Sequence, residues 1–179
     1  MSDAAEAVAA NLSSGRNVTI ELTNYTKKCC LADPKVYLEN GNVHIPPQPT
    51  VRPLKTELCN YSKQKGKATG AVGVMTYDIL MLGKKDPDKI AIMFSVPYDY
   101  NFYKNWFAIG IFPQSQGCNE DLYKKMYYKE DEAFVRAEAK GNCIMTSNKD
   151  VIIKATMSPL SGAIMKVEVW DIIEGFCKK

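Results

Sequence analysis

The residues that could do chemistry in this sequence are mainly tyrosines, and they gather in two short stretches. The first, Ser95–Trp106, reads SVPYDYNFYKNW, and the second, Leu122–Lys129, reads LYKKMYYK. The face of a tyrosine ring attracts a quaternary ammonium, and its hydroxyl can bond a phosphate oxygen. This chemistry is recognition of a cationic or zwitterionic headgroup, without covalent catalysis.

The second stretch has the signals of a short helix, predicted over Glu120–Lys129. Asn119 is a suitable N-cap, acidic residues open the first turn and a lysine ends the last, as the helix dipole prefers. Tyr123 and Tyr127 are four residues apart and share one face of this helix. Judged from the helix alone, these tyrosines could equally be packing residues. The neighbouring aromatic stretch is needed to choose between packing and ligand binding.

The first stretch places aromatic side chains in a loop after an apolar strand. Pro97 ends regular strand pairing, and Tyr98, Tyr100, Phe102 and Tyr103 follow within six residues. A loop has little room to bury so many rings, which indicates contact with another molecule.

Composition excludes several other functions. A net charge of +3 is too small for a nucleic-acid binder, and we expect no nucleic acid partner. The sole histidine, His44, has no nucleophile to serve, and the glycine-rich stretch Thr69–Val74 (TGAVGV) lacks the lysine of a phosphate-binding loop. We therefore expect no enzyme activity, no catalytic residue and no cofactor, and we read these glycines as permitting close approach of strands.

The cysteines have no metal-ligand spacing, and we expect no metal site and mostly reduced thiols. They are Cys29, Cys30, Cys59, Cys118, Cys143 and Cys177.

Strand signals dominate the rest of the chain. Short alternating or apolar segments separated by turns predict a mainly β fold, a two-sheet sandwich flanked by two short α-helices. The 179 residues fit one domain, with residues 1–15 as a short N-terminal helix or arm, its helix over about Asp3–Leu12. The dipeptide Asn40-Gly41 predicts a hairpin between Val36–Glu39 and Asn42–Ile45. Further strands are expected at Asn17–Leu22, Lys55–Tyr61, Ala71–Leu80, Ile90–Val96, Trp106–Phe112, Val151–Met157 and Ala163–Trp170.

The two tyrosine stretches together with TGAVGV resemble the three signature stretches of the actinoporins, the pore-forming toxins of sea anemones. The resemblance extends in order from Arg16 to about Val169, and the overall pattern is most similar to the actinoporin-like proteins of vertebrates such as fish. It implies a β-sandwich with two helices that binds sphingomyelin through its phosphocholine headgroup.

The resemblance also assigns roles to individual residues. It implies headgroup binding by Val72, Ser95, Pro97, Tyr103, Tyr123, Tyr127, Tyr128 and Arg16. It implies a membrane-interface role for Tyr98, Tyr100, Phe102 and Trp106, with Phe102 standing where the toxins usually carry a tryptophan.

Membrane lipid is thus the expected partner, and the family pattern adds self-oligomerisation on membranes. Pore formation stays open, because the dozen residues before Ser13 would span only about 18 Å as a helix, against a hydrocarbon core of about 30 Å. A glycan-binding lectin with the same sandwich and no pore formation is the alternative, since aromatic rings also stack on sugars. Met1–Leu12 has no pattern of a signal peptide, so we expect a soluble protein, cytosolic or secreted, that acts at target cell membranes.

Overall fold

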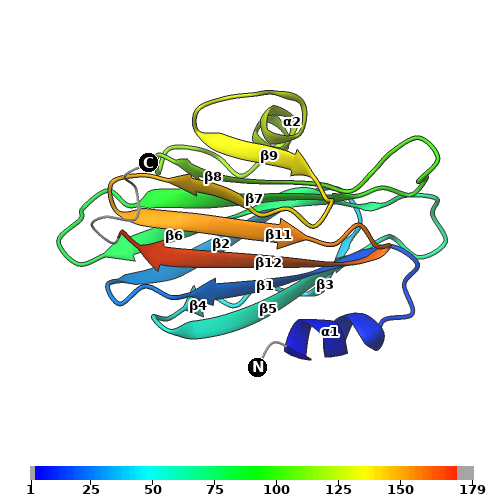
Figure 1. Ribbon diagram of the computed structural model, residues 1–179, viewed down its shortest axis with the longest axis horizontal. Coiled ribbons are helices and arrows are strands. Elements are labelled where there is room, and N and C mark those ends of the chain that lie inside the picture. Colours follow the sequence, from blue (N-terminus) through cyan, green and yellow to red (C-terminus); the bar gives the residue numbers. More distant parts are fainter. Residues whose placement is uncertain (1–2, 173–179) are drawn as a thin grey trace.

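Two six-stranded β-sheets pack face to face in the computed structural model, which describes residues 3–172 (Figure 1). One sheet runs in the order β10 (Ile144–Ser147), β11 (Val151–Met157), β12 (Gly162–Asp171), β1 (Asn17–Asn24), β5 (Lys55–Ser62) and β3 (Asn42–Ile45). The other runs in the order β4 (Thr50–Val51), β2 (Cys29–Asn40), β6 (Ala71–Met81), β7 (Asp88–Val96), β8 (Trp106–Phe112) and β9 (Phe134–Glu138).

The alternating side chains of both sheets form the core between them. Val18, Ile20 and Leu22 of β1 point inward, and the apolar residues of β12 alternate with half-buried ones along the strand. Strand β7 is buried at nearly every position, because sheet and helix cover both of its faces. The rings of Tyr61 and Phe94 stack across the two sheets with centroids 4.7 Å apart.

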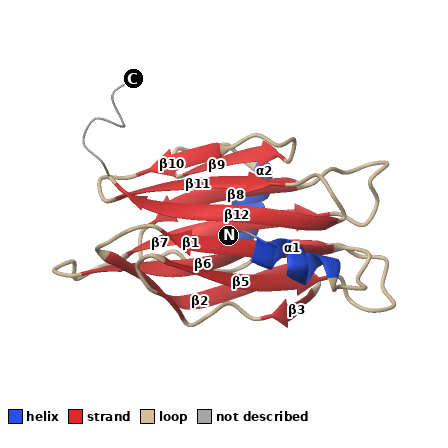
Figure 2. Cartoon of the chain, turned by 60° about the horizontal axis from the view of Figure 1, so that its bottom comes forward, coloured by secondary structure: helices blue, strands red, loops and turns tan. Residues whose placement is uncertain are grey.

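Each helix covers the outer face of one sheet (Figures 1 and 2). Helix α1 (Asp3–Ala10) lies over β1 and β12, where Ala5 is buried and Glu6 pairs with Lys166 at 2.9 Å. Helix α2 (Glu120–Tyr128) packs Leu122 and Met126 on the other sheet, and Asn119 caps it by accepting a hydrogen bond from the backbone N–H of Leu122. The predicted sandwich with two flanking helices is confirmed.

The predicted hairpin at Asn40-Gly41 is wrong. Strand β2 pairs with β4 and β6, whereas β3 pairs with β5 of the opposite sheet. The chain crosses between the sheets at Gly41, whose φ of 111° and close approach to the backbone of Ser62 both require glycine. The short strands β4, β9 and β10 and the first half of β2 were not predicted, and Cys177 lies outside the described residues.

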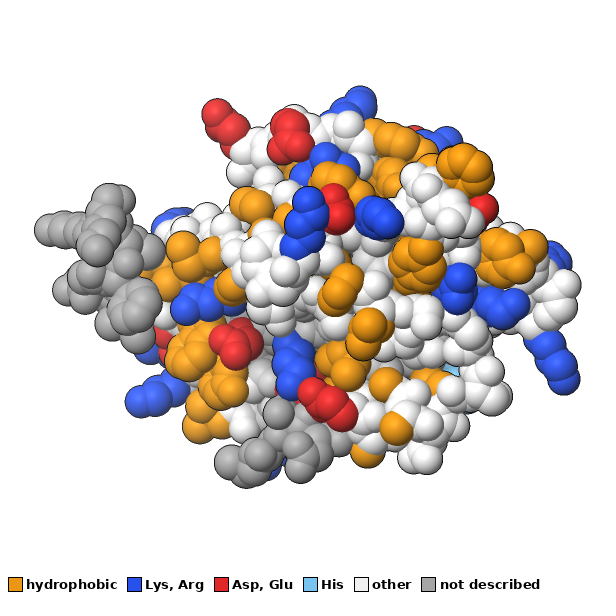
Figure 3. All heavy atoms as spheres, turned by 45° about the vertical axis from the view of Figure 1, so that its right-hand side comes forward, with side chains coloured by type: hydrophobic (Ala, Val, Ile, Leu, Met, Phe, Trp, Pro, Cys, Tyr) orange, Lys and Arg blue, Asp and Glu red, His pale blue; other side chains and the backbone are white. Residues whose placement is uncertain are grey.

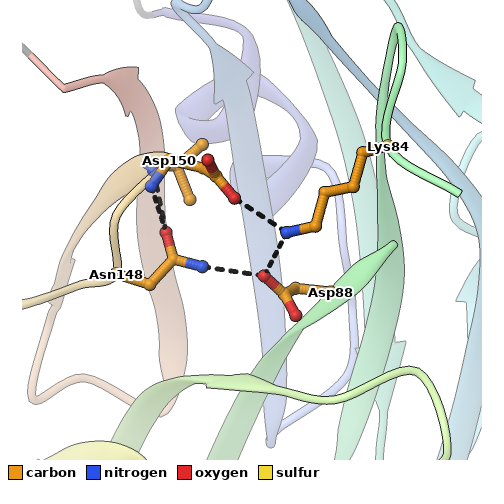
Figure 4. Close-up of polar contacts among 5 residues, drawn as sticks. Lys84, Asp88, Asn148 and Asp150 are labelled. Atoms are coloured by element: carbon orange, nitrogen blue, oxygen red, sulfur yellow. Dashed lines mark hydrogen bonds and ion pairs between the residues drawn. The ribbon is translucent and has the colours of Figure 1, made fainter. Parts of the chain in front are cut away.

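An ionic network joins the two sheets at the end of the sandwich where β6 turns into β7 (Figure 4). The ammonium of Lys84 lies 2.7 Å from a carboxylate oxygen of Asp88 and 2.7 Å from one of Asp150. Asn148 donates to Asp88 at 2.9 Å and accepts from the backbone N–H of Asp150 at 2.8 Å. The network therefore holds the β6–β7 turn against the β10–β11 turn.

We expect Lys84→Met to lower the free energy of unfolding by about 1 to 2 kcal/mol at pH 7, since the two carboxylates lose their shared partner. The hydrogen bonds to Asp150 and Asp88 raise the pKa of Lys84 above its ordinary value of 10.5. The stabilisation is therefore complete below pH 10.5 and is lost as the pH rises through the raised value. Urea denaturation between pH 7 and 11 should show the gap between wild type and variant closing at the alkaline end.

The matched control is Lys85→Met, because Lys85 is the exposed neighbour. A Lys85→Met variant as unstable as Lys84→Met, or a gap that does not depend on pH, would contradict this account.

Candidate functional site

A pocket of about 400 Å³ opens beside α2, on the outer face of the second sheet. Its floor follows one register row across adjacent strands, in which Asn40 of β2 pairs with Val72 of β6 and Val72 pairs with Ser95 of β7. Val72 is 7% exposed and Ser95 is 3% exposed, so both lie at the base of the hollow. We call this hollow the tyrosine pocket; it is lined by Glu39, Asn40, Ala68, Thr69, Gly70, Val72, Ser95, Pro97, Tyr98, Asp99, Tyr103, Tyr123, Lys124, Tyr127 and Tyr128.

Helix α2 supplies one wall as a row of rings. Tyr123 is buried against the sheet, Tyr127 is half-buried, and Tyr128 is exposed. The centroids of Tyr123 and Tyr127 are 5.7 Å apart, and Tyr127 meets Tyr128 edge to face at 4.7 Å. The i, i+4 spacing read from the sequence thus places two of these rings side by side.

Burial raises the pKa of both inner phenols. For Tyr123 the loss of solvent is the main cause, and for Tyr127 burial acts together with the neighbouring Tyr128, partly opposed by a hydrogen bond with Ser95. Both hydroxyls are therefore neutral donors at physiological pH.

The opposite wall is the aromatic loop, residues 97–105, between β7 and β8. Pro97 is buried, while Tyr98 and Tyr103 line the pocket and are 46% and 59% exposed as residues. The backbone N–H of Tyr103 donates to the carbonyl of Asp99 at 3.1 Å, which closes a turn within the loop. Phe102 projects into solvent and is 79% exposed.

Polar groups that the sequence did not single out complete the pocket. Thr69 places a buried hydroxyl without a hydrogen-bond partner on its lining. The carboxylate of Glu39 accepts a hydrogen bond of 2.7 Å from Tyr37, whose ring lies 6.3 Å from that of Tyr123. No motif marks Glu39, which reaches this face beside the crossing at Gly41, whereas Thr69 opens the TGAVGV stretch although no role was predicted for it.

The glycines of TGAVGV allow the floor to form. A Cβ on Gly70 would lie 2.1 Å from the carbonyl oxygen of Val96, and a Cβ on Gly73 would lie 2.3 Å from that of Tyr37. The reading of these glycines as sites of close strand approach is confirmed.

Arg16 lies outside the tyrosine pocket, on the far side of the aromatic loop. Its guanidinium donates to the carbonyl of Pro97 at 3.0 Å and to that of Tyr98 at 2.7 Å. It also sits over the rings of Tyr98 and Tyr100, at 5.6 and 4.8 Å from their centroids. Arg16 thus supports the loop from behind and lines a neighbouring hollow with Lys63.

Two residues assigned to the membrane interface are half-buried. Tyr100 packs against the core and donates from its hydroxyl to Asn105 at 2.8 Å. Trp106 continues the register row of the pocket floor, and the guanidinium of Arg136 covers its ring at 4.2 Å from the centroid. Among the headgroup residues expected from the sequence, all except Arg16 line the tyrosine pocket.

Comparison with known proteins gives consistent results. The profile of the sea anemone cytotoxic protein family matches residues 7–169. DELTA-actitoxin-Aeq1a of Actinia equina is 35% identical over 114 residues, which are 63% of this chain and 50% of the toxin. Nigrelysin of Anthopleura nigrescens is 32% identical over 114 residues, with the same shares of the two chains. The chain thus spans about half the length of the curated relatives it matches.

A solved structure shares the fold. The crystal structure of the lipid binding protein Nakanori superimposes with a TM-score of 0.69 at 15% identity, covering 94% of this chain and 78% of that one.

Proposed function

Since this chain belongs to the sea anemone cytotoxic protein family, we propose that it binds lipid bilayers by enclosing phosphocholine headgroups, those of sphingomyelin above all, in the tyrosine pocket. The observation that carries the proposal is the row of rings from Tyr123 to Tyr128 facing Tyr103 across a hollow of about 400 Å³. Pockets of this volume commonly hold small ligands.

The chemistry of the walls supports a zwitterionic ligand. Tyrosine faces attract a trimethylammonium group by about 0.5 to 2 kcal/mol per contact. The carboxylates of Glu39 and Asp99 on the pocket lining add negative potential for the same group. The phenols of the inner tyrosines are donors for phosphate oxygens.

Exposed aromatic side chains support contact with the bilayer itself. Phe102 and Tyr98 project beside the pocket opening, and aromatic rings favour the boundary between lipid and water. Among the described residues, no helix has the length and apolar character to cross a membrane. Helix α1 has eight residues and extends about 12 Å.

The test is co-sedimentation with phosphatidylcholine vesicles, with and without sphingomyelin, in the presence of free phosphocholine as competitor. We expect binding that requires sphingomyelin and is displaced by phosphocholine. Release of a trapped dye from the same vesicles decides between binding alone and pore formation.

Absence of binding to either vesicle would overturn the proposal. Displacement by galactose-type sugars instead of phosphocholine would establish the alternative function, a glycan-binding lectin.

A further inference from the structure

The turn between β11 and β12 carries an exposed leucine that the headgroup site does not use. Leu160 is 62% exposed at the tip of this turn, which belongs to the opposite sheet from the tyrosine pocket. A single exposed leucine needs no explanation by itself. Leu160 is of interest because its turn is bonded to the aromatic loop.

The turn and the aromatic loop are joined through one buried side chain. The amide nitrogen of Asn105, a residue only 2% exposed, donates to the carbonyl of Ser158 at 3.1 Å and to that of Leu160 at 2.9 Å. The amide oxygen of Asn105 accepts from the hydroxyl of Tyr100 at 2.8 Å. Because the loop and the turn share this amide, Leu160 has a fixed position beside the residues that flank the pocket.

The turn is also stiff within itself. The backbone N–H of Ser158 donates to the carbonyl of Ile164 at 3.0 Å, and the N–H of Ile164 donates back to the hydroxyl of Ser158 at 3.0 Å. Pro159 fixes its own φ between these bonds. The backbone that carries Leu160 therefore loses little further conformational freedom when the turn enters an apolar medium.

The surroundings of Leu160 fit a bilayer. Figure 1 places the aromatic loop, the β5–β6 loop and the β11–β12 turn at the same end of the sandwich, and Figure 3 shows apolar side chains interspersed with basic ones at this end. Lys65 and Lys67 of the β5–β6 loop and Lys104 of the aromatic loop are exposed there. Apolar tips among lysines are typical of surfaces that enter the headgroup region of a membrane.

We propose that Leu160 is a second lipid-inserting residue, which enters the same leaflet as Phe102 while the tyrosine pocket holds a headgroup. The inference rests on the proposed function and adds to it a contact from the other sheet. Insertion from both sheets limits the tilt of the sandwich on the membrane. Insertion of the aromatic loop alone would leave the sandwich free to rotate about that loop.

The experiment compares Leu160→Ser with Leu82→Ser on vesicles of phosphatidylcholine and sphingomyelin. Leu82 is fully exposed in the β6–β7 turn, next to the Lys84 network at the other end of the sandwich, so its substitution is a matched control. We expect Leu160→Ser to weaken binding about three- to tenfold, the loss for roughly half of a leucine side chain leaving water. Leu82→Ser should bind as the wild type does.

A second measurement reports insertion directly. Leu160→Trp should give tryptophan emission that shifts to the blue on vesicle binding and is quenched by brominated acyl chains, beyond the wild-type response of Trp106 and Trp170, whereas Leu82→Trp should add neither change. If the wild type binds but Leu160→Ser binds equally well and Leu160→Trp adds no quenching, this inference is wrong and the proposed function stands. If the wild type does not bind, both fail together.

Discussion

Tyr127→Ala should weaken binding to sphingomyelin vesicles by tenfold or more, equivalent to at least about 1.4 kcal/mol. Tyr127 is the middle ring of the α2 row, in contact with Tyr123 at 5.7 Å and with Tyr128 at 4.7 Å. Its removal takes away one cation–π contact with the ligand. It also removes the edge-to-face contact that holds the ring of Tyr128 in place. Co-sedimentation over a range of lipid concentrations measures the change.

Two variants test whether the effect belongs to this site. Tyr127→Phe keeps the ring and removes the hydroxyl, so it should retain most of the binding if the ring face holds the ammonium. Tyr25→Ala removes an exposed tyrosine that stacks on Trp170 at 4.3 Å, at the far end of β1 from Arg16, and should leave binding unchanged. Full binding by folded Tyr127→Ala would remove this residue from the site.

Gly73→Ala should lower the free energy of unfolding by about 2 to 3 kcal/mol, more than we expect for Lys84→Met. The added methyl would lie 2.3 Å from the carbonyl oxygen of Tyr37 and 3.1 Å from the Cα of Leu38, and backbone atoms cannot rotate away. Strand β2 would have to separate from β6 next to Val72, so binding should weaken as well. Urea denaturation measures the stability directly.

Gly162→Ala is the matched control, because Gly162 also lies in a strand. A Cβ there would meet only the side-chain nitrogen of Asn17, at an ordinary 3.7 Å. This variant should be as stable as the wild type or slightly more so. Equal stabilities of the Gly73 and Gly162 variants would show that β2 and β6 tolerate a wider spacing.

Most of the fold could be predicted because its strands carry strong local patterns. The alternation in β12 and the apolar run in β7 indicate which faces of these strands are buried. The alternation in β1 predicted one buried face, but every position of β1 is buried, because α1 also covers this strand. No local sequence pattern, however, indicates which strands pair with each other. Asn40-Gly41 has the sequence of a tight hairpin, yet β3 pairs with β5 of the other sheet, where Val43 lies opposite Tyr61. The edge strand β10 has only four residues, too few for a reliable periodicity.

The site was predictable to the extent that its residues lie within motifs. The helical spacing of the α2 tyrosines and the aromatic content of the loop both lead to the pocket. Arg16 was assigned to the headgroup by the family resemblance alone. Its partners are carbonyls of Pro97 and Tyr98, about eighty residues away, and a sequence does not reveal such long-range bonds. Glu39 lines the pocket beside the crossing at Gly41, which the sequence pattern did not reveal either.

The parallel pairing of β1 with β12 sets the time at which this protein can fold. Asn17 pairs with Gly162, so one neighbour of β1 is synthesised only about 145 residues later in the sequence. At 5 to 20 residues per second, the early strand waits on the order of ten seconds for this partner. During that interval the sheet that carries the tyrosine pocket has its inner face, including Phe94, without the full opposite sheet. The complete sandwich can therefore form only after synthesis of β12, and its long-range pairing gives it a high contact order, which is typical of slow folding.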